Sequence, residues 1–162
     1  MHPESYEQAS QYAQLLKADL GDRELMIADI GSQDINGTYR SLFSNERWHY
    51  LGIDMAPGKN VDHVATEQEL YPEPESFDVV ICGQVLEHAE MPWVLIRKIA
   101  AITKPGGRIW LSAPYQWDYH PYPKDCWRIY PDGMRALLRW ASLTEKQVYV
   151  NANDTIALAE KP

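Results

Sequence analysis

The segment Leu25-Met26-Ile27-Ala28-Asp29-Ile30-Gly31 decides the fold class of this chain. Its first six residues form an apolar run with a single acid near its end, which is typical of a strand buried on both faces of a parallel sheet. A glycine directly after such a strand lets the backbone turn tightly, and a ligand can approach it without meeting a Cβ atom. The segment therefore predicts a parallel strand whose carboxyl end faces a binding site.

Short apolar runs and amphipathic segments alternate on either side of this strand. Further strands are predicted at 50–54, 61–65, 77–83, 108–113, 147–150 and 155–158. Helices are predicted at 4–20, 38–46, 91–103 and 131–141. The pattern indicates one domain over residues 1–162 with an α/β, Rossmann-like fold in three α/β/α layers. Its doubly wound, mostly parallel sheet gains a C-terminal antiparallel hairpin strand.

The composition is that of an ordinary globular protein, with 45% hydrophobic residues and a net charge of −8. Phosphate contacts need clustered Lys and Arg, and the 15 basic residues are scattered, so we expect no nucleic-acid partner. No apolar run reaches the roughly 18 residues of a membrane span, and the first residues lack the regions of a signal peptide. Since two cysteines are too few for a disulfide framework, these features predict a cytoplasmic protein without membrane contact.

Two motifs at predicted strand ends point to a nucleoside-containing cofactor. Gly31 follows the first strand, and Asp54 ends the next one about 20 residues later, where an acid accepts hydrogen bonds from ribose hydroxyls. A dinucleotide site would have glycine at the positions of Gln33 and Asn36. Asp34 is expected to point a negative charge into the same loop, which suits an ammonium and a sulfonium better than phosphates.

Five short segments resemble, in order and spacing, the motifs of class I S-adenosylmethionine-dependent methyltransferases, and most closely those of the methyltransferase-11 type. The segments are Ala28-Asp29-Ile30-Gly31, Gly52-Ile53-Asp54, Phe77-Asp78-Val79-Val80, Leu86-Glu87-His88 and Lys104-Pro105-Gly106-Gly107. The resemblance covers residues 24–115 well, and residues 120–133 look like a loop-and-helix element of one bacterial subset. It implies S-adenosylmethionine as cofactor and S-adenosylhomocysteine as product.

The resemblance also implies roles for single residues. Asp29 and Gly31 match positions that receive the methionine part of the cofactor, Asp54 matches the ribose-binding acid, and the Gln84 backbone carbonyl matches a contact of the cofactor amino group. The full expected cofactor site is Asp29, Gly31, Ser32, Gly37, Asp54, Met55, Thr66, Glu67 and Gln84. Gln33 departs from the family, which has a second glycine there.

Methyl transfer from a sulfonium is an in-line displacement in which the protein aligns the acceptor and excludes water. An acceptor hydroxyl or ammonium must also lose a proton to a base. The candidate catalytic bases are His88, after the strand at 77–83, and His120, in the loop after the strand at 108–113. The alternatives are that Glu87 and His88 cap or orient the next helix, and that His120 is a surface histidine in a proline-rich turn.

The loop at 115–131 is expected to form the acceptor site. Its dense aromatic residues fit either a wall for an apolar or ring-bearing acceptor or a small satellite core. The expected substrate-binding residues are Tyr115, Trp117, Trp127 and Arg128. A second role for Arg128 is pairing with Asp125 to fix the loop, instead of binding an acceptor carboxylate or phosphate. His120 and Asp125 without a third ligand predict no metal site.

These observations favour a methyltransferase that acts on oxygen, nitrogen or carbon of a small molecule, because the chain has little besides the core fold with which to recognise a macromolecule. A second subunit that closes the site, in a homodimer, is compatible with the sparse lid. The alternative function is a non-catalytic accessory protein that binds S-adenosylmethionine. A nicotinamide-dependent oxidoreductase is disfavoured by Gln33, Asn36 and the terminal hairpin.

Overall fold

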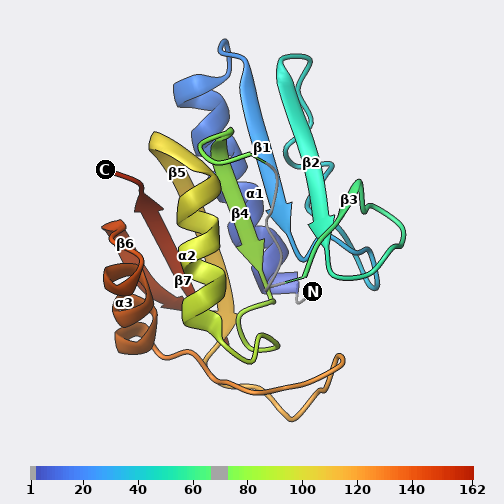
Figure 1. Ribbon diagram of the computed structural model, residues 1–162, viewed down its shortest axis with the longest axis vertical. Helices are drawn as coiled ribbons and strands as arrows, with labels where there is room; N and C mark the ends of the chain where they lie inside the picture. Colours follow the sequence, from blue (N-terminus) through green and yellow to red (C-terminus); the bar gives the residue numbers. More distant parts are fainter. Residues whose placement is uncertain (1–2, 67–72) are drawn as a thin grey trace.

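A computed structural model describes residues 3–66 and 73–162 of the chain (Figure 1). The described elements are, in chain order, α1 (Pro3–Leu20), β1 (Leu25–Ile30), β2 (Trp48–Asp54), β3 (His63–Val64), β4 (Phe77–Gly83), α2 (Pro92–Ile102), β5 (Thr103–Pro114), α3 (Pro131–Trp140), β6 (Thr144–Asn151) and β7 (Asp154–Glu160). The strands form one seven-stranded sheet in the order β3-β2-β1-β4-β5-β7-β6. No helix within the described ranges is long and apolar enough to cross a membrane.

The sheet is parallel from β3 to β5, and β7 runs antiparallel to both of its neighbours. The predicted doubly wound sheet with a C-terminal antiparallel hairpin strand is therefore confirmed. The register pairs Asp29 with Gly52 on β2 and with Ile81 on β4. The carboxyl ends of β1, β2 and β4 consequently meet at one edge, where the order of the strands reverses and ligands of such sheets bind.

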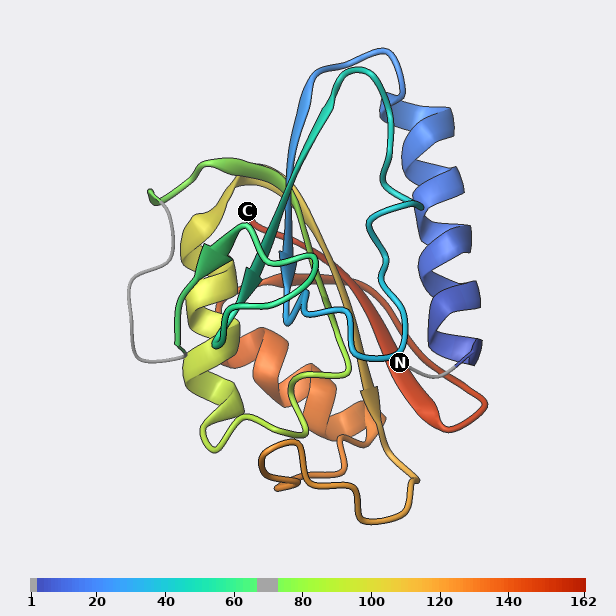
Figure 2. The ribbon, with the colours of Figure 1, turned by 90° about the vertical axis from the view of Figure 1, so that its right-hand side faces the viewer.

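Helices cover both faces of the sheet, which confirms the three layers. Figure 2 shows α1 alone on one side and α2 with α3 on the other. Successive side chains of a strand point to opposite faces, so Val79 and Ile81 of β4 pack in the core on the α1 side. Val80 and Cys82 pack in the core on the α2 and α3 side, and Cys82 is buried as expected.

Two local expectations were wrong. Residues 38–46 form a turn and no helix, with hydrogen bonds from Leu42 N to Tyr39 O (2.8 Å) and from Phe43 N to Arg40 O (3.2 Å). Tyr39 and Phe43 are buried in the core beside α1, so the turn satisfies their burial without a helix. Strand β5 begins at Thr103 and not near 108, because Thr103 pairs with Phe77 before a shift in register absorbs the Pro-Gly-Gly segment.

Candidate active site

A cavity of about 1040 Å³ opens at the carboxyl ends of the central strands. Eight of the nine expected cofactor residues line it: Asp29, Gly31, Ser32, Gly37, Asp54, Met55, Thr66 and Gln84. The ninth, Glu67, lies outside the described residues. Both candidate bases, His88 and His120, also line the cavity, as does Trp117 from the aromatic loop. The other expected substrate-binding residues, Tyr115, Trp127 and Arg128, lie outside its lining.

Asp29 presents a buried carboxyl group to this cavity at 2% exposure. The hydroxyl of Tyr50 donates a hydrogen bond to Oδ2, whereas Oδ1 has no hydrogen-bond partner within the described parts of the chain. Burial raises the pKa of Asp29 to about 7, although the hydrogen bond from Tyr50 opposes the rise. A buried acceptor without a partner is costly, so this oxygen fits a ligand that brings an N–H donor and a positive charge.

Gly31 turns the chain away from Asp29 with a φ of +79°, a conformation that side chains rarely adopt. A Cβ atom at Gly31 would lie 2.1 Å from Cγ2 of Val85, so no side chain fits there. The amides of Gly31 and Ser32 donate to the carbonyl of Ile53, at 2.8 and 3.1 Å. The turn after β1 is thereby fastened to the end of β2 and presents bare backbone to the cavity.

The Asp54 carboxylate holds the loop after β1 as well as facing the cavity. The backbone amide of Gln33 donates to its Oδ2 at 2.9 Å, and the amide of Ala56 donates to Oδ1 at 3.3 Å. Because each carboxylate oxygen has two lone pairs, both oxygens can still accept from a pair of ribose hydroxyls. Met55 follows Asp54, is 57% exposed and lines the same cavity. Its side chain suits an apolar contact with a nucleobase.

The Asp34 carboxylate lies in the loop after β1, as expected, but Asp34 is not among the residues that line the cavity. Its carboxylate accepts from the amide of Gly37 at 2.9 Å and pairs with the Lys59 ammonium at 2.5 Å. These contacts hold the pKa of Asp34 below its usual value, with the hydrogen bond from Lys59 as the largest cause. The charge therefore ties the loop after β1 to the loop after β2.

Gln84 follows β4 with a positive φ of +61°. Its side-chain amide donates to Ser112 Oγ at 3.1 Å and to Asp154 Oδ2 at 3.0 Å, and lies 3.5 Å from Ser5 Oγ. The side chain thus joins β4 to β5, β7 and α1. The contribution of Gln84 to a ligand site would come from its backbone, as the family resemblance implies.

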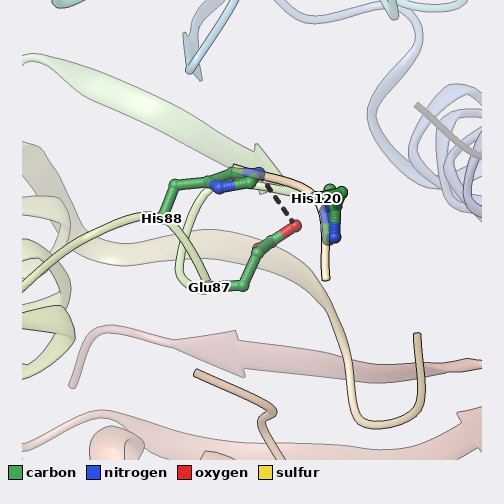
Figure 3. A group of neighbouring side chains, drawn as sticks. All are labelled: Glu87, His88 and His120. Atoms are coloured by element: carbon green, nitrogen blue, oxygen red, sulfur yellow. Dashed lines mark ion pairs between the residues drawn. The ribbon is translucent and has the colours of Figure 1, made fainter. Parts of the chain in front are cut away.

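Glu87, His88 and His120 form a cluster at the cavity wall (Figure 3). Nε2 of His88 lies 3.6 Å from Oε1 of Glu87, and the two imidazole rings meet edge to face with centroids 5.1 Å apart. Glu87 is fully buried, and neither carboxylate oxygen has a hydrogen-bond partner among the described residues. Burial raises the pKa of Glu87 to about 8 and lowers the pKa of His88.

The capping alternative for Glu87 and His88 is not what the structure shows. The residue before the first turn of α2 is Met91, and no side chain caps that end of the helix. Glu87 was not expected in the cavity, although Leu86-Glu87-His88 is one of the five motifs that resemble the family and could have indicated it. Tyr50, the partner of Asp29, was also missed, and nothing in its local sequence distinguishes it from an ordinary strand tyrosine.

Arg128 holds the loop at 115–131 together. Its guanidinium makes a bidentate pair with Asp125, at 2.6 and 2.8 Å. Its N–H groups also donate to the carbonyls of Trp117 (3.0 Å), Asp118 (2.9 Å) and Trp127 (2.7 Å). These five contacts match the five N–H donors of the side chain, which favours the loop-fixing role over binding of an acceptor carboxylate.

The aromatic side chains of this loop differ in what they contact. Trp127 donates from Nε1 to the carbonyl of Ala89 at 2.9 Å and contacts the ring of Trp93, with centroids 6.0 Å apart. Tyr115 donates to the carbonyl of Ala152 at 3.1 Å and packs beside Tyr130. These contacts attach Tyr115 and Trp127 to neighbouring segments without burying them in a core, since Trp127 stays 40% exposed. Trp117 lines the cavity, as a wall for an acceptor requires.

Comparisons with known proteins give matches over most of the chain. A family model described as a methyltransferase domain matches residues 8–150. A curated protein from Xanthomonas euvesicatoria pv. vesicatoria, a ubiquinone biosynthesis O-methyltransferase, is 43% identical over 54 residues, which are 33% of this chain and 20% of that protein. The chain therefore spans about a fifth to a quarter of the length of the curated relatives it matches.

Solved structures share the fold over nearly the whole chain. The 1,6-didemethyltoxoflavin-N1-methyltransferase of Burkholderia thailandensis, with bound 1,6-didemethyltoxoflavin and S-adenosylhomocysteine, has a TM-score of 0.73 at 20% identity and covers 98% of this chain and 79% of that one. An S-adenosylmethionine-dependent methyltransferase from Mesorhizobium loti has a TM-score of 0.67 at 15% identity and covers 96% and 98% of the two chains. At these identities the likeness shows the fold alone.

Proposed function

The chain belongs to the methyltransferase-domain family, as a class I S-adenosylmethionine-dependent member, and from this premise we propose that it methylates a small-molecule acceptor. Family membership confirms the resemblance in the sequence, and the cofactor of that class is S-adenosylmethionine. The observation that carries the proposal is the unpartnered Oδ1 of Asp29, buried in a cavity that the ribose-binding candidate Asp54 also lines.

The residues present fit this cofactor. Asp29 offers a buried acceptor to the ammonium of the methionine part, and the backbone of Gly31 lines the cavity beside it. Asp54 offers two oxygens to the ribose hydroxyls, and Met55 offers an apolar face to the adenine. When bound, S-adenosylmethionine supplies a methyl group on an activated sulfonium leaving group.

The chain itself has to align the acceptor, exclude water and accept the acceptor's proton. His88 and His120 reach the cavity from the loops after β4 and β5. The lowered pKa of His88 keeps its imidazole neutral near pH 7, as a proton acceptor requires. The loop fixed by Arg128 lies beyond the carboxyl end of β5 and places Trp117 against the same cavity (Figure 1).

A small acceptor is supported by the concave site and by the kinds of enzymes that the chain resembles. The cavity continues from the expected cofactor residues to Tyr122 and Lys124 of the aromatic loop. The names of two similar proteins refer to ubiquinone biosynthesis and to 1,6-didemethyltoxoflavin. We propose a ring-bearing acceptor of a size similar to 1,6-didemethyltoxoflavin. The cytoplasmic location and the homodimer remain predictions.

Titration calorimetry with S-adenosylmethionine, S-adenosylhomocysteine and NAD tests the cofactor assignment. We expect heat with the first two and none with NAD. Transfer of labelled methyl groups to a panel of hydroxylated and nitrogen-containing ring compounds then tests the reaction. Absence of binding to both adenosyl compounds by folded protein would overturn the proposal, and binding without transfer to any acceptor would favour the accessory-protein alternative.

A further inference from the structure

We propose that Glu87, His88 and His120 bind a divalent transition-metal ion at the cavity wall, and that the ion positions an acceptor oxygen. The binding of the ion stands on the geometry of these three side chains alone. Only the role toward the acceptor rests on the proposed methyltransferase function. The ligand atoms come from the loops after β4 and β5 and lie within 4.8 Å of one another, and Figure 3 shows the three side chains gathered in one place.

Both histidines are held in the form that a metal ion requires. Nδ1 of His88 lies 2.5 Å from the carbonyl oxygen of Lys124, and Nδ1 of His120 lies 2.9 Å from the carbonyl oxygen of Asp118. A carbonyl oxygen only accepts, so each Nδ1 carries the hydrogen and each Nε2 carries the lone pair. Metal-bound histidines in proteins are oriented by such an outer contact of the second ring nitrogen.

The third ligand is a buried acid whose Oε1 lies 3.6 Å from Nε2 of His88. Both carboxylate oxygens of Glu87 are buried and accept no hydrogen bond from any described residue. The nearby guanidinium of Arg128 is committed to Asp125 and to loop carbonyls. A cation bound between Glu87 and the imidazoles would supply the interaction that a buried carboxylate otherwise lacks.

The backbone ties the three ligands together. The carbonyl of Glu87 accepts from the amides of Cys126 (2.7 Å) and Trp127 (3.1 Å) in the loop that carries His120. The Asp125 carboxylate accepts from the backbone amide of His120 at 2.8 Å and from Arg128. The loop after β5 is thus attached to the Glu87 peptide unit, which limits how far the ligands can separate.

The donor set selects a class of ion. Two imidazole nitrogens with one carboxylate suit Zn²⁺, Fe²⁺ or Co²⁺ better than Mg²⁺ or Ca²⁺, which prefer oxygen ligands. The three ligand atoms lie within 4.8 Å of one another. An ion with tetrahedral geometry and bonds of about 2.1 Å holds its ligand atoms about 3.4 Å apart. Binding therefore requires the distances between the three ligand atoms to shorten by up to about 1.5 Å.

Three protein ligands leave coordination positions open for an acceptor oxygen, whose hydroxyl becomes more acidic on the ion and releases its proton to solvent. A bound ion would occupy the Nε2 lone pairs of both histidines. In the loaded protein these histidines therefore act as ligands, and the ion replaces them in activating the acceptor hydroxyl.

The test is titration of tag-free, chelator-treated protein with Zn²⁺ by calorimetry and with Co²⁺ by visible absorption. We expect one ion per chain with micromolar or tighter affinity. Glu87→Gln and His120→Asn should each weaken binding at least about tenfold. His49→Asn on β2, where the histidine side chain is 58% exposed, is the matched control and should bind as the unaltered protein does.

Two measurements keep the outcomes distinct. Cys126→Ser must retain binding, since an exposed thiol is also a strong ligand for these ions and could bind them elsewhere on the chain. Calorimetry with S-adenosylhomocysteine, run on the same samples, reports the fold and the proposed function separately from the metal. Failure of folded protein to bind either ion, or binding that survives both ligand substitutions, would overturn the inference whatever the cofactor does.

Discussion

The hydroxyl of Tyr50 donates to one oxygen of the Asp29 carboxyl group, and the other oxygen is buried without a hydrogen-bond partner among the described residues. Asp29 is one of the residues that line the cavity. Tyr50 is itself held by the guanidinium of Arg40, which lies 4.4 Å from the centre of its ring. Arg40 pairs in turn with Asp62, which accepts from the amide of Gly52 at 2.8 Å. A chain of contacts from the loop after β2 thus fixes Asp29 and leaves one oxygen for a ligand.

The first prediction is that Asp29→Asn stabilises the ligand-free protein while weakening cofactor binding. Burial raises the folded-state pKa of Asp29 from 3.8 to about 7. Between pH 3.8 and about pH 7, Asp29 is ionised in the unfolded chain but still protonated in the folded protein. The free energy of unfolding therefore falls as pH rises through this range, and the whole loss is present above about pH 7. Asparagine avoids that cost, and we expect a melting temperature higher by a few degrees at pH 8.

Differential scanning calorimetry without ligand and titration with S-adenosylhomocysteine check both effects. Asp78→Asn is the matched control, because the Lys104 ammonium lies 2.8 and 2.9 Å from the two Asp78 oxygens. Its substitution should lower the melting temperature. A lower melting temperature for Asp29→Asn would contradict the assigned cost of burying this carboxylate.

The second prediction concerns pH. An ammonium binds the ionised form of Asp29, and with a pKa of about 7 in the free protein this form is lost on acidification. Affinity for S-adenosylhomocysteine should therefore be constant above about pH 8 and should fall toward tenfold per unit below about pH 6. Calorimetric titrations across this range measure it. The Asp29→Asn variant should show a flat profile, and an equal slope in both proteins would show that another group is responsible.

The third prediction is that Asp54→Ala lowers cofactor affinity by at least about tenfold, because it removes two charged acceptors of ribose hydroxyls. Asp54 also accepts from the amides of Gln33 and Ala56, so part of the loss would come from a looser loop. Asp54→Asn keeps one acceptor oxygen and should lose less. Asp132→Ala, at a fully exposed acid on α3, is the surface control, and unchanged affinity in Asp54→Ala would refute the ribose placement.

The fourth prediction is that Arg128→Met loosens the loop at 115–131. The substitution keeps an apolar stem but removes both guanidinium donors to Asp125, and it leaves the backbone amide of His120 as a donor to this acid. The Asp125 side chain is 1% exposed, and Arg128 holds its pKa well below its usual range. A buried acid without its partner costs on the order of 1–3 kcal/mol. We expect a lower melting temperature and faster proteolytic cleavage within the loop.

Arg135→Met, which removes a partly exposed arginine paired with Asp132 and Glu145, should have little effect on either measurement. Asp125→Asn combined with Arg128→Met should recover part of the lost stability, because it removes the uncompensated charge. Loss of acceptor binding in Arg128→Met without any change in loop cleavage would instead support direct contact with the acceptor.

Much of the candidate site could be predicted because the residues proposed to face the cofactor follow directly from strand ends. Asp29 and Asp54 sit at the ends of apolar runs, and pairing of parallel strands brings such ends to one edge. The helix predicted at 38–46 failed because the burial of Tyr39 and Phe43 depends on α1, which lies far away in the sequence. Local spacing cannot distinguish a turn packed under a distant helix from a helix of its own.

The sequence by itself determined the α/β architecture and the edge of the sheet where a ligand is expected, because alternating apolar runs and strand-end acids are local patterns. The family was indicated by the resemblance of five short motifs, which are also local. Only the tertiary structure decided that Tyr50 leaves one oxygen of Asp29 open, that Arg128 fixes the loop, and that Glu87 meets His88 and His120. Those arrangements join segments that are distant along the chain, and hydrogen-bond partners and burial exist only once the chain has folded.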